Sequence, residues 1–313
     1  MSSTLKPPKL NPGDTIGIVG PASPMMPERL VKGIAYLQSR GFQVKLGRSI
    51  YEERGYLAGG DQERARDLTD MFADSEVRAV FCTRGGYGTP RILDRLDFEL
   101  IAGNPKILLG YSDITALQLA LFARCGLVTF SGPMVAVEMG RGLDATTEDH
   151  LWQMLSSTSA PVKLTEADDP LAVYHPGRAR GRLLGGCLSL VCALLGTPYL
   201  PDFSGAILFL EDVGEEPYQI DRKLMQLRLA GVLNQVSGIV LGAFEDCQPR
   251  SQAPSLSLED VFRDLLCDLD VPVVSGLPYG HVEKKVTLPL GVEAVLDAEQ
   301  GYLELLEPGV RES

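Results

Sequence analysis

The stretch ILLGYSDITALQLALFARCG, residues 107–126, joins a short apolar run to a longer helix-like run through one sharp turn. Its first part, Ile107–Leu109, is apolar at every position, which is typical of a strand buried on both faces of a parallel sheet. Its second part, Asp113–Cys125, has apolar residues at helical spacing, and Gly126 stands where such a helix would end. The stretch therefore predicts a strand, a turn and a helix, the unit from which parallel α/β sheets are built.

The same rhythm of apolar run, glycine-containing turn and helix-like run extends from Thr15 to about Met134. It predicts a parallel sheet surrounded by helices, with all five apolar runs as central strands. The expected strands are Ile16–Val19, Val44–Leu46, Ala79–Cys82, Ile107–Leu109 and Val128–Phe130. The expected helices are Pro27–Arg40, Gln62–Asp74, Pro90–Ile101 and Asp113–Cys125.

The rhythm breaks at residues 156–180, where clusters of Ser, Thr, Pro and Asp are typical of a linker or a long surface loop. We therefore expect an α/β domain at 1–160, a linker or loop at 161–180 and a second, β-richer domain at 181–313. The expected strands of the second domain are Ala206–Leu210, Gly238–Leu241, Val271–Val274 and Ala294–Leu296. Its clearest expected helices are Gln219–Leu229 and Leu256–Leu269.

Composition excludes several classes of protein. With 313 residues, 45% of them hydrophobic and 22% charged, the chain is long and apolar enough for about two folded domains. The formal net charge is −12, so nucleic acid and anionic membrane surfaces are not expected partners. Neither a signal-like apolar run near the start nor a run of about 18 apolar residues occurs, so we expect a cytoplasmic protein.

Motifs for metals and nucleotide cofactors do not occur in the sequence. The six cysteines form no C-x-x-C pair, and the three histidines are too scattered to suggest a metal cluster. The sequence holds no G-x-x-x-x-G-K-[ST] phosphate loop, and G-I-V-G-P-A at 17–22 does not match G-x-G-x-x-G. We expect no metal and no cofactor.

Ser112 is the first candidate for chemistry, because it stands where the apolar run at 107–109 turns into the following helix. A serine on such a turn presents its hydroxyl at the carboxyl edge of the sheet, where a nucleophile is placed in some hydrolases. The pattern falls short of G-x-S-x-G because Ile114 occupies the position of the second glycine. The alternative is that Ser112 only caps the helix, which is the commoner role of serine there.

A second candidate follows the expected strand Ala79–Cys82, where the chain reads R-G-G-Y-G at 84–88. Its glycines allow the main chain to approach a ligand, so the N–H groups of Gly85 and Gly86 are candidates to face an oxyanion; the alternative is a simple turn. Arg84 and Arg91 are candidates to bind a carboxylate, against the alternative of solvated surface arginines.

In the second half, Glu211 and His281 each follow an apolar run. A serine nucleophile needs a base, and the base needs a carboxylate to orient it, which these two residues would supply. The alternatives are a solvated acidic loop that begins at Glu211 and a structural or exposed role for His281. His150 and His175 are weaker candidates, because the first lies in a polar helix-like stretch and the second in the expected linker.

Six blocks, taken together and in this order, resemble the LD-carboxypeptidases (muramoyltetrapeptide carboxypeptidases), which are serine peptidases of muropeptide recycling. The blocks are GIVGPASP at 17–24, RGGYGTPR at 84–91, ILLGYSDIT at 107–115, FSGPM at 130–134, FLEDVGEEPYQIDR at 209–222 and LPYGHVEKKVTLPLG at 277–291. The resemblance implies a triad of Ser112, His281 and Glu211. It also implies an oxyanion hole formed by the N–H of Asp113 and that of Gly85 or Gly86.

The resemblance further implies an amidotransferase-like parallel α/β domain followed by a β-rich C-terminal domain, and a homodimer. The implied substrate is a cytoplasmic murein tetrapeptide, which is cut between the diamino acid at position three and the terminal D-alanine. The implied activity needs no metal.

Two other functions are compatible with these residues. Some members of the family hydrolyse peptidyl or aminoacyl nucleotide antibiotics, for which an aromatic side chain over the site would help to bind the base. The sequence offers little for this role, since its sole tryptophan, Trp152, lies in a helix-like stretch and the segment 156–180 contains only Tyr174. The second alternative is a muropeptide-binding protein that keeps the fold without turnover.

Overall fold

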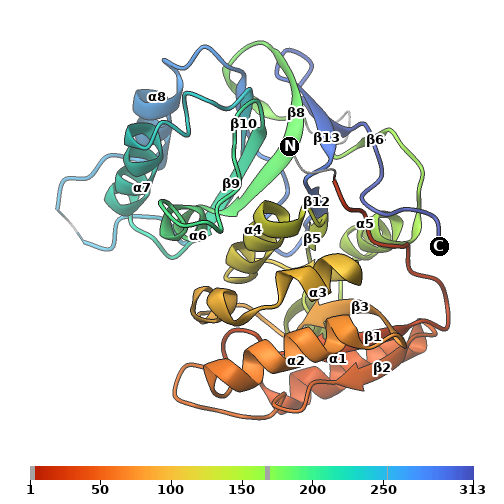
Figure 1. Ribbon diagram of the computed structural model, residues 1–313. Coiled ribbons are helices and arrows are strands. Elements are labelled where there is room, and N and C mark those ends of the chain that lie inside the picture. Colours follow the sequence, from red (N-terminus) through yellow and green to blue (C-terminus); the bar gives the residue numbers. More distant parts are fainter. Residues whose placement is uncertain (1–3, 166–169, 252) are drawn as a thin grey trace.

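The computed structural model describes residues 4–165, 170–251 and 253–313, which form two sheets with helices around and between them (Figure 1). The first sheet has the strand order β12-β5-β4-β3-β1-β2, with β1 to β5 parallel and β12 antiparallel to β5. Its strands are β1 (Thr15–Val19), β2 (Gln43–Leu46), β3 (Val77–Cys82), β4 (Ile107–Gly110), β5 (Thr129–Ser131) and β12 (Leu288–Leu290). Its helical elements are α1 (Pro27–Ser39), α2 (Asp61–Ala73), η1 (Thr89–Arg95), α3 (Phe98–Gly103), α4 (Ile114–Cys125), η2 (Val135–Met139) and α5 (Ala145–Ser156).

The second sheet is mixed and has eight strands in the order β6-β14-β13-β8-β9-β10-β11-β7. The four central strands β8 to β11 are parallel, and antiparallel strands flank them on both sides. The strands are β6 (Val162–Lys163), β7 (Ala172–His175), β8 (Arg178–Cys187), β9 (Ile207–Val213), β10 (Gly238–Glu245), β11 (Val273–Ser275), β13 (Glu293–Asp297) and β14 (Tyr302–Leu305). The helices of this half are α6 (Leu188–Ala193), α7 (Pro217–Leu229) and α8 (Leu258–Leu266).

The predicted fold class, a parallel α/β half followed by a β-rich half, is confirmed, and two local predictions are wrong. Residues 90–101 do not form one helix, because Leu96 is extended and Asp97 starts a new helix by accepting a hydrogen bond from the Leu100 N–H. The strand at Val44–Leu46 is not central: β2 is the edge of the first sheet, and none of its residues is fully buried. Its Lys45 points to solvent and indicates an edge strand.

The stretch expected to be a linker contains short strands that join the second sheet. β6 pairs with β14, β7 pairs with β11, and β8 begins at Arg178. Residues 166–169 of this stretch lie outside the described residues. We propose that the division between the halves falls near residue 160, with the exception of β12, which returns to the first sheet from the second half of the chain.

Helix α4 joins the two halves and places the turn that precedes it. It contacts β4, β5 and β12 of the first sheet and β8 and α6 of the second half, and it lies between the two halves in Figure 1. Residues 114–121 of the helix are all buried, so both sheets cover it. The Gln118 amide donates hydrogen bonds to the carbonyls of Gly110 and Phe130, at 2.9 and 2.8 Å, which fixes the helix to β4 and β5.

Candidate active site

Ser112 lies on a strained turn between β4 and α4. Its φ of 67° is in the left-handed region, which non-glycine residues rarely adopt and which often marks a functional position. Asp113, not Ser112, is the N-cap residue of α4, and the Ser112 hydroxyl is bonded to His281 instead of to an N–H of the helix. The geometry therefore disfavours the alternative in which Ser112 only caps the helix.

Three of the predicted residues form one chain of hydrogen bonds. His281 Nε2 lies 3.1 Å from Ser112 Oγ, and His281 Nδ1 lies 2.8 Å from Glu211 Oε2. With Nδ1–H donating to the carboxylate, Nε2 is the acceptor for the hydroxyl proton. Ser112 comes from the first half, Glu211 from β9, and His281 from the loop between β11 and β12, so both halves contribute to the arrangement.

Glu211 is fully buried at the carboxyl end of β9. Burial raises the pKa of this carboxyl, and the hydrogen bond from His281 acts in the opposite direction. The carboxylate lies directly beneath Gly280, where a β-carbon would come within 2.8 Å of Oε2. The residue before His281 therefore has to be glycine for the loop to approach the carboxylate this closely.

The R-G-G-Y-G turn lies directly beside Ser112. A β-carbon on Gly85 would lie 2.9 Å from Ser112 Cβ and 3.0 Å from Ser112 Oγ, closer than ordinary packing allows. Gly86 has a φ of 113° and lies against Ser23, whose hydroxyl accepts a hydrogen bond from the Tyr87 N–H at 3.0 Å. Glycine at position 85 thus allows the turn to contact Ser112, and glycine at position 86 allows it to pack against Ser23.

Asp113 ties this turn to the serine turn. Its buried carboxylate accepts a hydrogen bond from the Thr89 N–H at 2.8 Å, and the Thr89 hydroxyl donates to its carbonyl. Burial raises the pKa of Asp113, and the bonds from Thr89 oppose this shift. Within the described part of the chain, the N–H groups of Gly85, Gly86 and Asp113 donate no hydrogen bond, so they are available to an oxyanion.

The two candidate arginines differ in how their charge is used. Arg91 forms a bidentate pair with Asp61, at 2.7 and 3.0 Å, and this pairing lowers the pKa of Asp61 to about 2. Arg84 is half-buried and donates only to carbonyls, those of Gly85 at 3.2 Å and Pro24 at 3.3 Å. Among the described residues, Arg84 has no carboxylate partner, which makes it the better candidate to bind a substrate carboxylate.

The other two histidines take no part in this arrangement. His150, on α5, is half-buried and accepts a hydrogen bond from the Thr287 N–H at 3.0 Å, and the burial of its imidazole lowers its pKa to about 4. His175 lies in β7, at the edge of the second sheet, where its Nδ1 is bonded to the Pro176 carbonyl.

Residues around His281 that the sequence did not single out are Tyr111, Glu138 and Lys285. The Tyr111 ring packs edge-on against the imidazole, with 5.0 Å between ring centroids. Lys285 Nζ lies 2.5 Å from Glu138 Oε1, and both side chains are largely buried. Tyr111 and Lys285 both lie in sequence blocks quoted above, directly before Ser112 and four residues after His281, whereas Glu138 lies in none of them. Lys285 was passed over because two adjacent lysines are ordinarily exposed.

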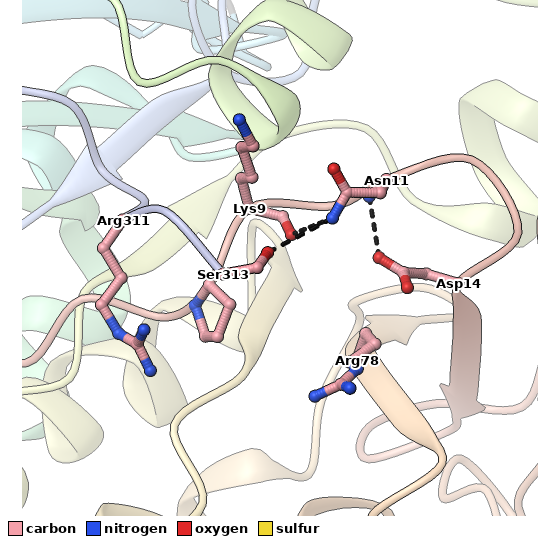
Figure 2. Close-up of a pocket in the computed structure, with 7 residues that line it drawn as sticks. Lys9, Asn11, Asp14, Arg78, Arg311 and Ser313 are labelled. Carbon is pink, nitrogen blue, oxygen red and sulfur yellow. Dashed lines mark hydrogen bonds between the residues drawn. The ribbon is translucent and has the colours of Figure 1, made fainter.

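A separate cavity of about 250 Å³ lies at the amino edge of the first sheet, the edge opposite to that of Ser112 (Figure 2). Arg78, near the start of β3, lines it together with Lys9 and Asn11, and Figure 2 shows the Asn11 amide bonded to Lys9 and Ser313. Ser112 lies at the carboxyl edge, so this cavity is not part of the site.

In the described ranges, no helix is long and apolar enough to cross a membrane. Nor does any cluster of three or more His, Cys, Asp or Glu there have the geometry of a metal site.

Comparison with known proteins identifies the family. Residues 16–132 match the model of the LD-carboxypeptidase N-terminal domain, and residues 180–296 match that of the LD-carboxypeptidase C-terminal domain. The chain belongs to the LD-carboxypeptidase family. It is 43% identical over 312 residues to a "Probable murein peptide carboxypeptidase" of Bacillus subtilis, with 99% of this chain and 97% of that protein covered.

Two solved structures have the same fold as this chain. A muramoyltetrapeptide carboxypeptidase from Oxalobacter formigenes superposes with a TM-score of 0.82 at 34% identity, covering 95% of this chain and 99% of the other. The microcin C7 self-immunity protein MccF, in complex with aspartyl sulfamoyl adenosine, superposes with a TM-score of 0.91 at 27% identity, covering 98% and 100%. The muramoyltetrapeptide carboxypeptidase and MccF therefore share this architecture.

Proposed function

We propose that the chain is a serine LD-carboxypeptidase that releases the terminal D-alanine from murein tetrapeptides. The continuous hydrogen-bond chain from the Ser112 hydroxyl through His281 to the buried Glu211 carboxylate carries this proposal. Serine hydroxyls are weak nucleophiles, and a base within hydrogen-bond reach, oriented by a third group, activates them. The relatives that are named as murein peptide carboxypeptidases support the substrate class.

In the acylation step, Ser112 Oγ attacks the carbonyl carbon of the scissile bond while its proton passes to His281 Nε2. Glu211 stays bonded to Nδ1–H and offsets the charge of the imidazolium. We assign the developing oxyanion to the N–H of Asp113 and that of Gly85 or Gly86. When the tetrahedral intermediate collapses, the C–N bond breaks and the imidazolium gives its proton to the amine of D-alanine.

In the deacylation step, water attacks the acyl–serine ester, and His281 accepts one of its protons. The second tetrahedral intermediate then collapses, and the Ser112 oxygen leaves with that proton. The free serine and the neutral imidazole are regenerated, and each cycle consumes one water molecule.

A carboxypeptidase also has to bind the terminal carboxylate of its substrate. We assign this role to Arg84, which lies next to Gly85 and pairs with no carboxylate in the described residues. A guanidinium presents two parallel N–H donors to a carboxylate, which would favour a free chain end over an internal peptide bond.

The test is replacement of Ser112 by Ala, with D-alanine release from a tetrapeptide as the readout. We expect at least about a thousandfold loss of kcat and an unchanged fold, because the nucleophile is removed. Ser257→Ala is the matched control, since Ser257 caps α8 and its loss should cost about 1 kcal/mol of stability without affecting turnover. A Ser112→Ala protein that still releases D-alanine at the normal rate would contradict the proposal.

Substrate stereochemistry gives a second arm of this test. The proposed reaction cuts between an L-centre and a terminal D-residue, so a peptide ending in D-Ala-D-Ala should react poorly. Equal rates on both peptides would count against LD-carboxypeptidase activity.

MccF-like hydrolysis of aminoacyl nucleotides is the second candidate, favoured by the superposition on MccF. The two aromatic residues considered for base recognition pack against other side chains. Trp152 stacks on Phe42 at 5.0 Å between centroids, and Tyr174 packs against Phe262. We therefore expect a muropeptide to be turned over faster than an aminoacyl-sulfamoyl adenosine when both are assayed side by side. Tight binding of a tetrapeptide without D-alanine release would instead favour a binding protein.

We also propose that the protein acts in the cytoplasm as a homodimer, as the family resemblance implies. Sedimentation velocity over a range of concentrations tests the assembly, and a monomer throughout that range would contradict it.

A further inference from the structure

Behind His281 lies a buried cluster that the proposed mechanism does not use. Lys285 Nζ is 2.5 Å from Glu138 Oε1 and 3.2 Å from the Tyr111 hydroxyl, which itself donates to Glu138 Oε1 at 2.7 Å. The Lys285 ammonium also lies 4.3 Å from the centroid of the Tyr111 ring. The other Glu138 oxygen accepts a hydrogen bond from the Met134 N–H at 2.9 Å. The three side chains therefore hold one another in a single geometry.

The charges of the cluster balance. Burial acts to raise the pKa of Glu138, but the Lys285 ammonium and the N–H and O–H donors outweigh it and hold this pKa below its ordinary value. Burial and the neighbouring Glu138 carboxylate raise the pKa of the Tyr111 hydroxyl, which therefore stays protonated. The cluster thus consists of one cation, one anion and one neutral phenol.

Of the three side chains of the cluster, the Tyr111 ring is the one that packs against the His281 imidazole. The hydrogen bond to Glu211 fixes the tautomer of the imidazole, whereas the edge-on contact with the Tyr111 ring fixes the plane of the imidazole. Tyr111 and Glu138 belong to the first half, whereas Lys285 belongs to the loop that carries His281. The ion pair therefore anchors the histidine loop to the half that holds Ser112.

We propose that Glu138 and Lys285 are positioning residues that act on His281 through Tyr111, and that their opposite charges keep the imidazole free of a net field from this side. The proposal rests on the role of His281 in the proposed function. Replacing either Glu138 or Lys285 by an uncharged residue leaves an uncompensated buried charge near the imidazole. The sign of that charge should set the direction in which the imidazole titration moves.

The other ionisable groups around His281 are common to all variants of the cluster. Glu211 of β9 is bonded to His281, and Asp212, Cys187 and Tyr279 lie near Glu211. Glu283 and Lys284, on the loop of His281 itself, are exposed. Because they remain unchanged, a difference between variants reports on Glu138 and Lys285.

The test follows the imidazole of His281 by NMR titration, which needs no turnover. The chain has three histidines, so the C–H resonance of His281 is assigned as the one lost in His281→Gln. Lys285→Met leaves the Glu138 carboxylate and should raise the titration midpoint by about one pH unit, whereas Glu138→Gln leaves the ammonium and should lower it by about as much. The double variant should return the midpoint to its original value, because no net charge remains.

Lys284→Met is the matched control, since Lys284 is exposed and adjacent in sequence. It should leave the midpoint unchanged, and so should Lys285→Arg, which keeps a cation at position 285. Shifts in the same direction for the two single variants, or a shift for Lys284→Met as large as that for Lys285→Met, would overturn the proposal.

Tyr111→Phe keeps the ring and the ion pair but removes the bond between them, so it should fold even if the single charge variants do not. We expect kcat to fall by about tenfold with KM little changed, because only the orientation of the base is affected. An unchanged kcat would overturn the positioning role. Absence of D-alanine release by the unaltered protein would instead refute the proposed function, and the NMR shifts would still report on the cluster.

Discussion

At Gly85, the absence of a side chain allows the R-G-G-Y-G turn to contact Ser112. We predict that Gly85→Ala lowers kcat by at least about a hundredfold, because the new methyl group would fall 3.0 Å from Ser112 Oγ and displace the oxyanion N–H groups. Turnover of a tetrapeptide and the melting temperature of the same sample provide the measurement.

Gly103→Ala is the control for this substitution. No atom lies within 4 Å of a β-carbon at Gly103, the last residue of α3, so the same chemical change should leave kcat unaltered. Wild-type kcat in Gly85→Ala would show that the turn does not need this close approach.

Arg84 and Arg91 are a matched pair for testing recognition of the substrate carboxylate. Arg84→Ala should raise KM for the tetrapeptide by about tenfold or more, since a charge-assisted hydrogen bond to substrate would be lost. Arg91→Ala should leave KM nearly unchanged, because Asp61 already occupies that guanidinium. Steady-state kinetics of both variants decide the assignment, and unchanged constants in Arg84→Ala would place the carboxylate site elsewhere.

At the scale of elements, α5 holds the segment that follows His281. The Thr147 hydroxyl accepts a hydrogen bond from the Lys285 N–H at 3.0 Å, and His150 accepts one from the Thr287 N–H. Both contacts lie within residues 285–287, directly before β12. The histidine loop is thus fixed by a helix as well as by a strand.

His150 should make this contact sensitive to acid. Its pKa of about 4 in the folded protein lies below the ordinary value of 6.5, so between these pH values the unfolded chain binds a proton that the folded chain does not. Stability should therefore fall as the pH drops from about 6.5 to about 4 and then level off, with a contribution of about 3 kcal/mol.

Denaturant unfolding at several pH values measures this contribution. The free energy of unfolding of His150→Gln should fall less with acid than that of the unaltered protein. His175→Gln, at the sheet edge, should lose as much stability with acid as the unaltered protein does. Parallel curves for His150→Gln and the unaltered protein would contradict the assignment.

Local pattern was enough to predict most elements and to single out Ser112, Glu211 and His281 as candidates, and the family resemblance then implied that the three form a triad. Buried parallel strands are continuous apolar runs, and the candidate residues follow such runs at the edge where ligands bind. The partners of Lys285 and the place of β12 were not predictable in this way, because the short run Leu288–Leu290 and the isolated Glu138 carry no local pattern that indicates which distant residues they contact. Glu138 lies in the π-helical turn η2, which has no regular apolar period to reveal it.

At the scale of the whole molecule, the proposed nucleophile and its proposed base come from different halves, and the proposed mechanism uses only groups of the chain and water. We predict that EDTA leaves turnover unchanged, because neither the triad nor the proposed oxyanion hole uses a metal ligand. D-alanine release after prolonged dialysis against the chelator is the measurement. Loss of activity that zinc restores would contradict the serine mechanism.

The return of β12 to the first sheet also affects which chimeras of related chains can fold. A chimera that takes residues 181–313 from one relative and 1–180 from another would carry the donor's edge strand into the recipient's sheet. Leu288–Leu290 would then have to pair with a foreign Thr129–Ser131. Functional hybrids should therefore arise most readily when the gene segment for 288–290 is inherited together with that for 129–131, although the two are distant in the reading frame.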